Sequence, residues 1–236
     1  MSANVHRTPR LADSRTFYLW MAAAIALIAF VGFAPTYYLS ALFGARHWPP
    51  LVHLHAALFT AWVAVLVTQA TLIRAGLTHV HRRIGSLAAL LAIAMLPVGT
   101  LVAIRAARRG LAPDGVDALT FMIVLLGALV VFATLVAVAI ANRRRPEWHK
   151  RFMLIATFAI LTPAIARFAI VGQRPVIALG LTGLLVVLVA ARDFRVLGRV
   201  HAATQWAGGF LIVSVPLRFV IGHPDAWHAF AARLVG

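Results

Sequence analysis

Residues 116–141 read VDALTFMIVLLGALVVFATLVAVAIA, and this stretch decides the class of fold. After the aspartate near its start it carries no charged side chain. A helix needs about 20 apolar residues to cross the hydrocarbon core of a bilayer. Because lipid offers no hydrogen bonds to the backbone, only helices and closed barrels span it. The stretch therefore predicts a transmembrane helix.

Seven segments of this kind occur along the chain. By hydropathy they cover residues 17–43, 50–74, 82–106, 116–141, 149–171, 175–191 and 200–221, of which the sixth is the shortest. The short connections indicate that consecutive helices pack as neighbours. The sequence predicts an all-α, polytopic transmembrane bundle of seven helices over residues 17–221. We expect a short disordered cytoplasmic arm at 1–16 and a short interfacial segment at 222–236.

The composition agrees with a membrane protein. Hydrophobic residues make up 62% of the chain and charged residues 12%, whereas soluble domains carry about 25% charged residues. The net charge of +16 would indicate nucleic acid in a soluble protein. Here the basic residues cluster between apolar segments, so we expect the lipid bilayer and its anionic headgroups as partners and no nucleic acid. The absence of cysteine excludes disulfides, iron–sulfur clusters and thiolate-ligated haem.

The distribution of basic residues predicts the orientation. With seven spans, the N-terminal arm shares a side with the connections between spans two and three, four and five, and six and seven. Of the 22 Lys and Arg residues, 14 fall on that side and 8 on the other. The positive-inside rule then places the N-terminus in the cytoplasm and the C-terminus outside. We expect the membrane to be the bacterial inner membrane.

Three histidines open three of the predicted helices on the cytoplasmic side. His81, His149 and His201 stand in the segments VHRRIG, WHKRFM and RVHAAT. Neutral imidazole is a common ligand of haem iron, zinc and copper, and two imidazoles from facing helices can hold one haem b. The three histidines are therefore the candidate ligands of a metal ion or haem b. The sequence leaves open the alternative that each is an interfacial anchor beside arginine.

Two glutamines are expected at the same depth. Gln69 lies near the cytoplasmic end of span two, and Gln205 follows His201 by one turn. Amide side chains are costly to expose to lipid, so we expect both to face the bundle interior. Four basic residues near the histidines could pair with haem propionates or another anion: Arg82, Arg83, Lys150 and Arg151.

Helical spacing separates two histidines of span two on the outer side. His53 and His55 point about 200° from each other on a helix, so they cannot both face one ion inside the bundle. Steps of seven residues from His55 reach Trp62 and Gln69, which places these three side chains on one stripe. We therefore expect His55 to face inward and His53 to contact water or headgroups.

Two arginines near the outer ends of spans are candidate binding residues. Arg167 follows Pro163, and Arg218 follows Pro216. Proline removes a helix hydrogen bond and can open room for water or a ligand. No carboxylate is expected inside a span where it could pair with these arginines. Each is therefore expected either to extend to the membrane surface or to face an anionic group.

Four segments carry a resemblance to known proteins: HLHAALFTAWVAVLVTQ, HRRIG, EWHKRFMLIATFAILTPAIARF and GRVHAATQWAGGFLIVSVPLRFVIG. Together they resemble an uncharacterised family of bacterial seven-helix membrane proteins over most of the chain after about residue 50. The resemblance implies architecture more than activity. More loosely, the histidines at helix ends are similar to those of multi-helix b-type cytochromes such as cytochrome b561, which hold haem between facing helices. In this chain the histidines lie closer to the helix ends than in those cytochromes.

Two functions follow from these residues. The first is a membrane-embedded redox protein that binds haem b or a metal ion through the three cytoplasmic histidines and transfers electrons across the membrane, with an outer site at His55, Arg167 and Arg218. The second is a non-redox transporter, sensor or assembly factor that binds an anionic or lipid-like ligand through Gln69, Gln205 and the two arginines. A structural protein with basic anchors is the third possibility. No nucleophile motif, HExxH motif or phosphate-binding glycine loop occurs.

Overall fold

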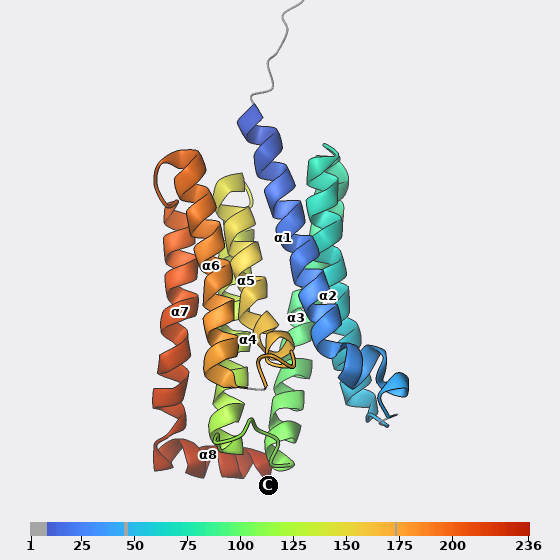
Figure 1. The fold of residues 1–236 in the computed structure, drawn as a ribbon, viewed down its shortest axis with the longest axis vertical. Coiled ribbons are helices and arrows are strands. Elements are labelled where there is room, and N and C mark those ends of the chain that lie inside the picture. Colours follow the sequence, from blue (N-terminus) through green and yellow to red (C-terminus); the bar gives the residue numbers. More distant parts are fainter. Residues whose placement is uncertain (1–8, 45–46, 173) are drawn as a thin grey trace, which may run out of the picture.

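The computed structural model describes residues 9–44, 47–172 and 174–236, and these ranges contain helices and no strand (Figure 1). The α-helices are α1 (Pro9–Phe33), α2 (Pro50–Arg74), α3 (Thr78–Arg108), α4 (Ala118–Ala141), α5 (Pro146–Ile165), α6 (Pro175–Leu197), α7 (Ala202–Gly222) and α8 (Asp225–Val235). A π-helical turn at Ala34–Tyr38 and a 3-10 turn at Ser40–Leu42 follow α1. The all-α prediction is confirmed.

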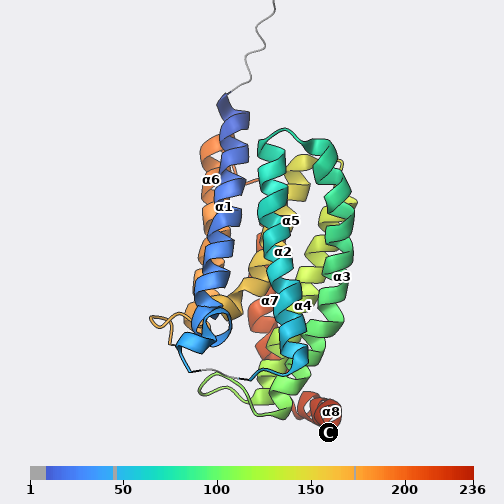
Figure 2. The same cartoon turned by 90° about the vertical axis from the view of Figure 1, so that its right-hand side faces the viewer.

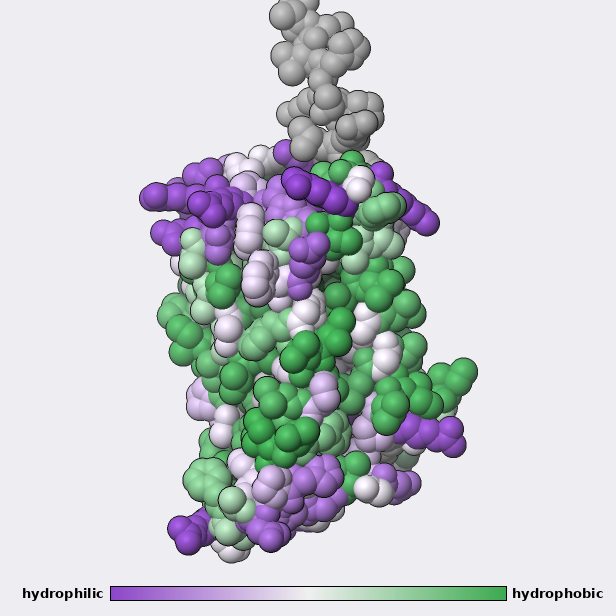
Figure 3. Space-filling model, turned by 90° about the vertical axis from the view of Figure 1, so that its left-hand side faces the viewer, coloured by the Kyte–Doolittle hydropathy of each residue, from purple (hydrophilic) through white to green (hydrophobic). Residues whose placement is uncertain are grey.

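Six helices in the described part of the chain are long and apolar enough to cross a membrane: α1 with its extension, α2, α3, α4, α6 and α7. Figure 3 shows the matching surface, with a broad hydrophobic band between hydrophilic ends. In water such a band would be costly, whereas lipid tails solvate it. The protein is therefore a multi-pass helical membrane protein.

Prolines and one aspartate mark where several helices begin. Pro50, Pro146 and Pro175 each stand in the first turn of a helix, where the missing N–H costs nothing. Asp117 precedes α4, and its carboxylate accepts hydrogen bonds from the N–H groups of Leu119 and Thr120. Burial raises the pKa of Asp117, but these bonds outweigh it and hold the pKa below its usual value.

The helices run up and down along the long axis, and α8 lies across one end (Figures 1 and 2). We call the end where α1, α3, α5 and α7 begin the N-terminal end, and the end that carries α8 the C-terminal end. The helices α1 to α5 pack in a ring, and α4 to α7 form a second group that shares α4 and α5 with it. The two groups are called here the five-helix half and the four-helix half.

The fifth predicted span is the one that departs from the simple hydropathy pattern. Eleven of the 20 residues of α5 are buried, because α1, α4, α6 and α7 all pack against it. The helix is less apolar than the six helices that could cross a membrane by length and composition, because Glu147, Lys150 and Arg151 lie in its first turns. Its polar first turns contact protein rather than lipid, so α5 can be less apolar than a lipid-facing helix.

The sixth span was expected to be the shortest, at 175–191, and this is wrong. Helix α6 continues to Leu197 and is long and apolar enough to cross a membrane. The charged residues Arg192 and Asp193 made its end look like a loop. Inside the bundle Asp193 is fully buried in an ion pair, so the helix continues through these positions.

The N-terminal end of the chain also differs from the expectation. Residues 1–8 of the predicted arm lie outside the described residues, but 9–16 belong to α1 rather than to a disordered arm. At the other end, the predicted interfacial segment is the helix α8. Ala231 of α8 is buried against α3 and α4 together with Ala103 and Met122, and the indole of Trp227 donates to the Leu119 carbonyl at 2.9 Å. This amphipathic helix closes the C-terminal end.

Candidate functional site

Two of the three predicted histidine ligands lie next to each other at the N-terminal end of the five-helix half. The ring centroids of His81 on α3 and His149 on α5 are 6.3 Å apart, and the rings are perpendicular. Gln69 of α2 joins them, since its side-chain Nε2 donates to the His81 carbonyl at 3.2 Å. The consecutive helices α2 and α3 and the more distant α5 therefore bring imidazole and amide groups to one place.

The hydrogen bonds around this pair leave ring nitrogens and an amide oxygen without a hydrogen-bond partner in the described part of the chain. His149 Nδ1 lies 2.8 Å from the Ala139 carbonyl. Because a carbonyl only accepts, Nδ1 carries the proton and Nε2 of the neutral ring keeps its lone pair. The buried Nδ1 of His81 and the buried Oε1 of Gln69 have no hydrogen-bond partner among the described residues. Buried polar atoms without partners are costly, so these atoms mark a candidate site.

His201 takes a different role from the other two histidines. It precedes α7, and its Nδ1 accepts a hydrogen bond from the Ala203 N–H at 3.0 Å. The proton of the neutral ring is therefore on Nε2, which removes the lone pair a metal would need there. Its ring lies against Trp148, with centroids 5.9 Å apart. Burial and the charge of Arg151 lower the pKa of His201 below its usual value, which keeps this helix cap neutral.

Across the described ranges, no three His, Asp or Glu side chains gather in a group that could hold a metal ion. The expected convergence of three histidines is therefore not seen, and a pair takes its place. A spacing argument could not separate the three, because each stands near the start of a helix at the same end of the bundle. The distinction comes from which backbone group each imidazole meets.

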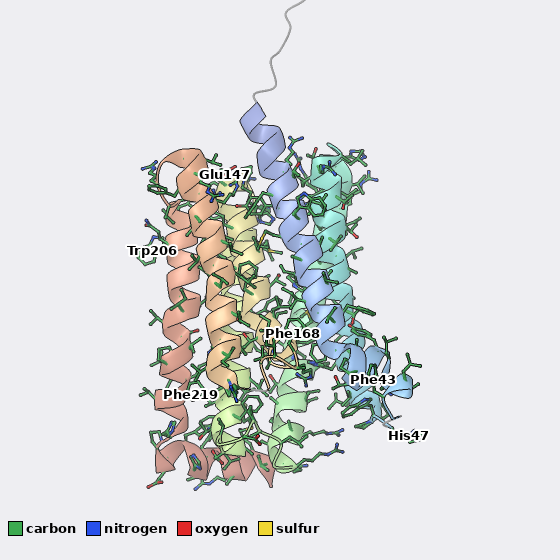
Figure 4. The ribbon with its side chains drawn as sticks, in the orientation of Figure 1. Phe43, His47, Glu147, Phe168, Trp206 and Phe219 are labelled. Atoms are coloured by element: carbon green, nitrogen blue, oxygen red, sulfur yellow. The ribbon has the colours of Figure 1, made fainter. Side chains whose placement is uncertain are left out.

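Gln205 does not face the interior, and that expectation is wrong. Its side chain is exposed, and its Nε2 reaches only the Val200 carbonyl at 3.5 Å. Trp206, beside it, points away from the bundle (Figure 4). The interior position at this depth belongs to Thr204, whose hydroxyl donates to Asp193 at 2.5 Å.

A buried ionic network at the N-terminal end was missed by the sequence interpretation. Arg151 and Asp193 are both fully buried and form a two-point ion pair between α5 and α6. Arg151 also donates to Glu147, at 2.6 Å. Figure 4 places Glu147 at the same end, where α5 begins. The network ties α5, α6 and α7 together, since Asp193 also accepts the hydroxyl of Thr204 and the N–H of His201.

This network changes the expected anion-binding role of the four basic residues. Arg151 has acidic partners, and Lys150 pairs with Glu147 at 2.6 Å. Arg82 and Arg83 are exposed. Of the four basic residues, Arg82 and Arg83 are the two that face outward, as expected for residues that contact headgroups.

The predicted inward stripe of α2 is confirmed. Trp62 is buried and donates to Thr157 of α5 at 3.2 Å. The Nδ1 of His55 and the Oε1 of Gln69 are both buried, and the His55 ring lies on Phe59 with centroids 4.1 Å apart. His53 is exposed and bonds to the Tyr37 hydroxyl at 2.9 Å. The seven-residue spacing therefore predicted correctly which of the two histidines faces inward.

The predicted outer site is divided between the two halves of the bundle. Arg167 is exposed, donates to the Pro163 carbonyl at 2.6 Å and lies over the Phe33 ring at 4.5 Å. Arg218 belongs to α7 and is only 6% exposed. It contacts α4, in the four-helix half, with a 3.4 Å hydrogen bond to the Val124 carbonyl. Arg218 therefore does not share a site with His55 and Arg167.

Arg218 borders a cavity of about 520 Å³ between α5, α6 and α7. This volume is in the range of about 300–1,000 Å³ that small-molecule sites occupy. The other lining residues are apolar except for two threonines, one of which is Thr162. The arginine and this cavity form the second candidate site.

Comparison with known proteins provides no further assignment. The chain matches no described protein family, no curated protein and no solved structure. The two candidate sites therefore rest on their geometry alone.

Proposed function

We propose that the protein binds haem b or a transition-metal ion through His81 and His149 at the N-terminal end of the five-helix half. The observation that carries this proposal is the pair of neighbouring imidazoles, whose ring centroids are 6.3 Å apart, with two buried polar atoms without partners among the described residues, one on His81 itself and one on Gln69. Haem b needs two axial imidazoles and no third histidine. An open metal site needs about three protein donors, and Gln69 Oε1 supplies a third.

The chain's own residues define what this site can do. The carbonyl of Ala139 orients the His149 ring, which is the role that outer hydrogen bonds play around metal ligands. Gln69 holds the backbone of His81 in place. Haem b or a redox-active metal ion would supply electron-transfer chemistry when bound, whereas zinc would not. Transfer across the membrane would need a second site, for which His55 is the candidate at the other end.

We further propose that all seven helices α1 to α7 cross a bacterial inner membrane, with the N-terminal end in the cytoplasm. The 20 residues of α5 measure about 30 Å at 1.5 Å per residue, which matches the hydrocarbon thickness of about 30 Å. The excess of Lys and Arg in the connections at the N-terminal end supports the orientation.

An absorption spectrum and an elemental analysis of the purified protein test the histidine site. We expect a Soret band or a bound metal, and His81→Gln or His149→Gln should lower the occupancy at least about tenfold. His79→Gln is the matched control, because His79 is exposed on the same helix. His201→Gln should also keep the cofactor. A purified protein with neither haem nor metal, or variants that bind as the wild type does, would exclude this function.

A non-redox binding protein for an anionic or lipid-like ligand is the second candidate function. The specific observation that favours it is the burial of Arg218 beside the apolar cavity. A transporter, sensor or assembly factor would use such a site without any haem or metal. The two candidates occupy different halves of the bundle, so each can be tested without the other.

A further inference from the structure

Arg218 is a charged side chain held inside the membrane bundle without an acidic partner. Its side chain is 6% exposed, and it takes part in no ion pair among the described residues. Its Nη2 donates to Ser214 at 2.7 Å and its Nη1 to the Val124 carbonyl at 3.4 Å. The buried Nε has no hydrogen-bond partner in this part of the chain. Neutral oxygens thus solvate the guanidinium without neutralising its charge.

The bundle is shaped to accept this side chain. A Cβ at Gly127 of α4 would lie 2.7 Å from the Cγ and Cδ of Arg218, so only glycine leaves room for the arginine. Ser214 lies one turn earlier on α7, which means that the guanidinium points toward the bundle middle rather than out to the membrane surface. An arginine that merely reached for headgroup water would extend the other way. The structure holds Arg218 inward.

The cavity beside Arg218 is built for a hydrocarbon chain. It is bounded by α5, α6 and α7, and its lining includes Thr162, Gly180, Gly183, Val187, Ile212 and Arg218. A Cβ at Gly180 or Gly183 would meet no atom within 4 Å, so the two glycines leave a groove along α6. Gly180 and Ile212 are exposed on the outer surface of the bundle, where a membrane would place lipid tails.

We propose that this cavity binds an anionic phospholipid from the bilayer, with its phosphate at Arg218 and one acyl chain in the groove between α6 and α7. The proposal rests on the second candidate function and is independent of the histidine site. A phosphate would supply the charge that the protein does not, through charge-assisted hydrogen bonds. The Cα of Arg218 lies four residues before the end of α7, or about 6 Å at 1.5 Å per residue, so a phosphate held by the inward-pointing guanidinium would lie deeper than the other headgroups.

The apolar lining decides against a water-soluble anion. A small hydrophilic anion would make no favourable contact with most of the apolar lining of the roughly 520 Å³ cavity, whereas an acyl chain would cover it. An acyl chain of a phospholipid fills the cavity, and the phosphate of the same molecule supplies the anion. A phospholipid is favoured over a protein partner because the groove opens toward the lipid-facing surface of α6 and α7.

Native mass spectrometry of the full chain, purified from nanodiscs that contain phosphatidylglycerol and phosphatidylcholine in equal amounts, tests this proposal. We expect one phosphatidylglycerol molecule to remain bound. Arg218→Gln should lower that occupancy at least about tenfold, because it removes the only charge at the site. Gly180→Leu should lower it equally, because its side chain fills the groove while the arginine remains.

Two matched controls separate a binding defect from a folding defect. Arg167→Gln removes an exposed arginine that lies over Phe33. Gly209→Leu adds a side chain at a position where, as at Gly180, a Cβ would meet no atom within 4 Å, but Gly209 does not line this cavity. Both should retain the lipid. If Arg218→Gln does not fold, Gly180→Leu against Gly209→Leu decides the matter.

Four results would overturn the proposal: no phosphatidylglycerol bound to the wild type, equal retention of phosphatidylcholine, lipid retained by both Arg218→Gln and Gly180→Leu, and a bound fatty acid in place of the phospholipid. The last result would keep the second candidate function while excluding this ligand. Absence of bound phosphatidylglycerol from the wild type would exclude this ligand but not a different anion at Arg218.

Discussion

Two buried arginines of this protein show how a membrane bundle treats a charge. Arg151 is fully buried and meets Asp193 and Glu147, whereas Arg218 meets only neutral oxygens. A paired charge is explained by structure alone, whereas an unpaired charge inside a membrane bundle marks a candidate functional site. From the sequence, Arg218 is a candidate binding residue, and Arg151 is one of four basic residues that could pair with an anion. The sequence could not show that Arg151 already has a partner, because Asp193 is 42 residues away in the chain.

The buried ion pair makes a first prediction at this scale. Asp193→Asn leaves Arg151 buried without its main counter-charge, so we expect the free energy of unfolding to fall by about 3–5 kcal/mol. Glu147→Gln is the control, since the Glu147 side chain is 50% exposed, and a loss below about 1 kcal/mol is expected there. Thermal unfolding in detergent, followed by circular dichroism, measures both. Equal stability of the two variants would show that the Asp193 contact contributes little.

At the scale of elements, close helix contacts position α5 in the middle of the molecule. Gly32 of α1 is buried where α1 meets α5, and a Cβ there would lie 2.2 Å from the Ala164 carbonyl. Such an approach lets backbones touch, which is how membrane helices gain packing energy. Hydropathy identified α2 at both bounds, 50–74. It could not show that α5 is enclosed by other helices, because it scores each residue as though it faced lipid.

This contact makes a second prediction. Gly32→Ala should destabilise the protein by about 1–3 kcal/mol, as overpacking does, although alanine favours helix over glycine by about 1 kcal/mol. The same change at Gly209, whose Cβ would meet no atom within 4 Å, should be neutral or stabilising. Melting temperatures of the two variants provide the comparison. A Gly32→Ala protein as stable as Gly209→Ala would mean that α1 can shift away from α5 at no cost.

At the scale of the whole molecule, the apolar segments predicted the helices well and the sites only in part. The inward stripe of His55, Trp62 and Gln69 followed from helical periodicity on one helix. The meeting of His81 with His149 and the separation of His201 did not, since they depend on how different helices pack. The full length of α6 could not be predicted either, because Asp193 near its end is charged and only the ion pair with another helix makes its burial possible. Local pattern predicts elements, and tertiary contact decides which polar groups become a site.

Topology provides the last prediction. If α5 crosses the membrane, the α4–α5 and α5–α6 connections lie on opposite sides, and the bundle ends differ in accessibility. The chain has no cysteine, so single cysteines report cleanly at four exposed positions: Asp114, Arg144, Ala169 and Ala232. With an impermeant maleimide applied to intact cells stripped of their outer membrane, Asp114→Cys, Ala169→Cys and Ala232→Cys should react. Arg144→Cys should react only after lysis, because the positive-inside rule places its connection in the cytoplasm. Reaction of Arg144→Cys together with Ala169→Cys in intact cells would show that α5 enters and leaves on one face, whereas the reverse pattern at all four positions would invert the orientation and keep the seven spans.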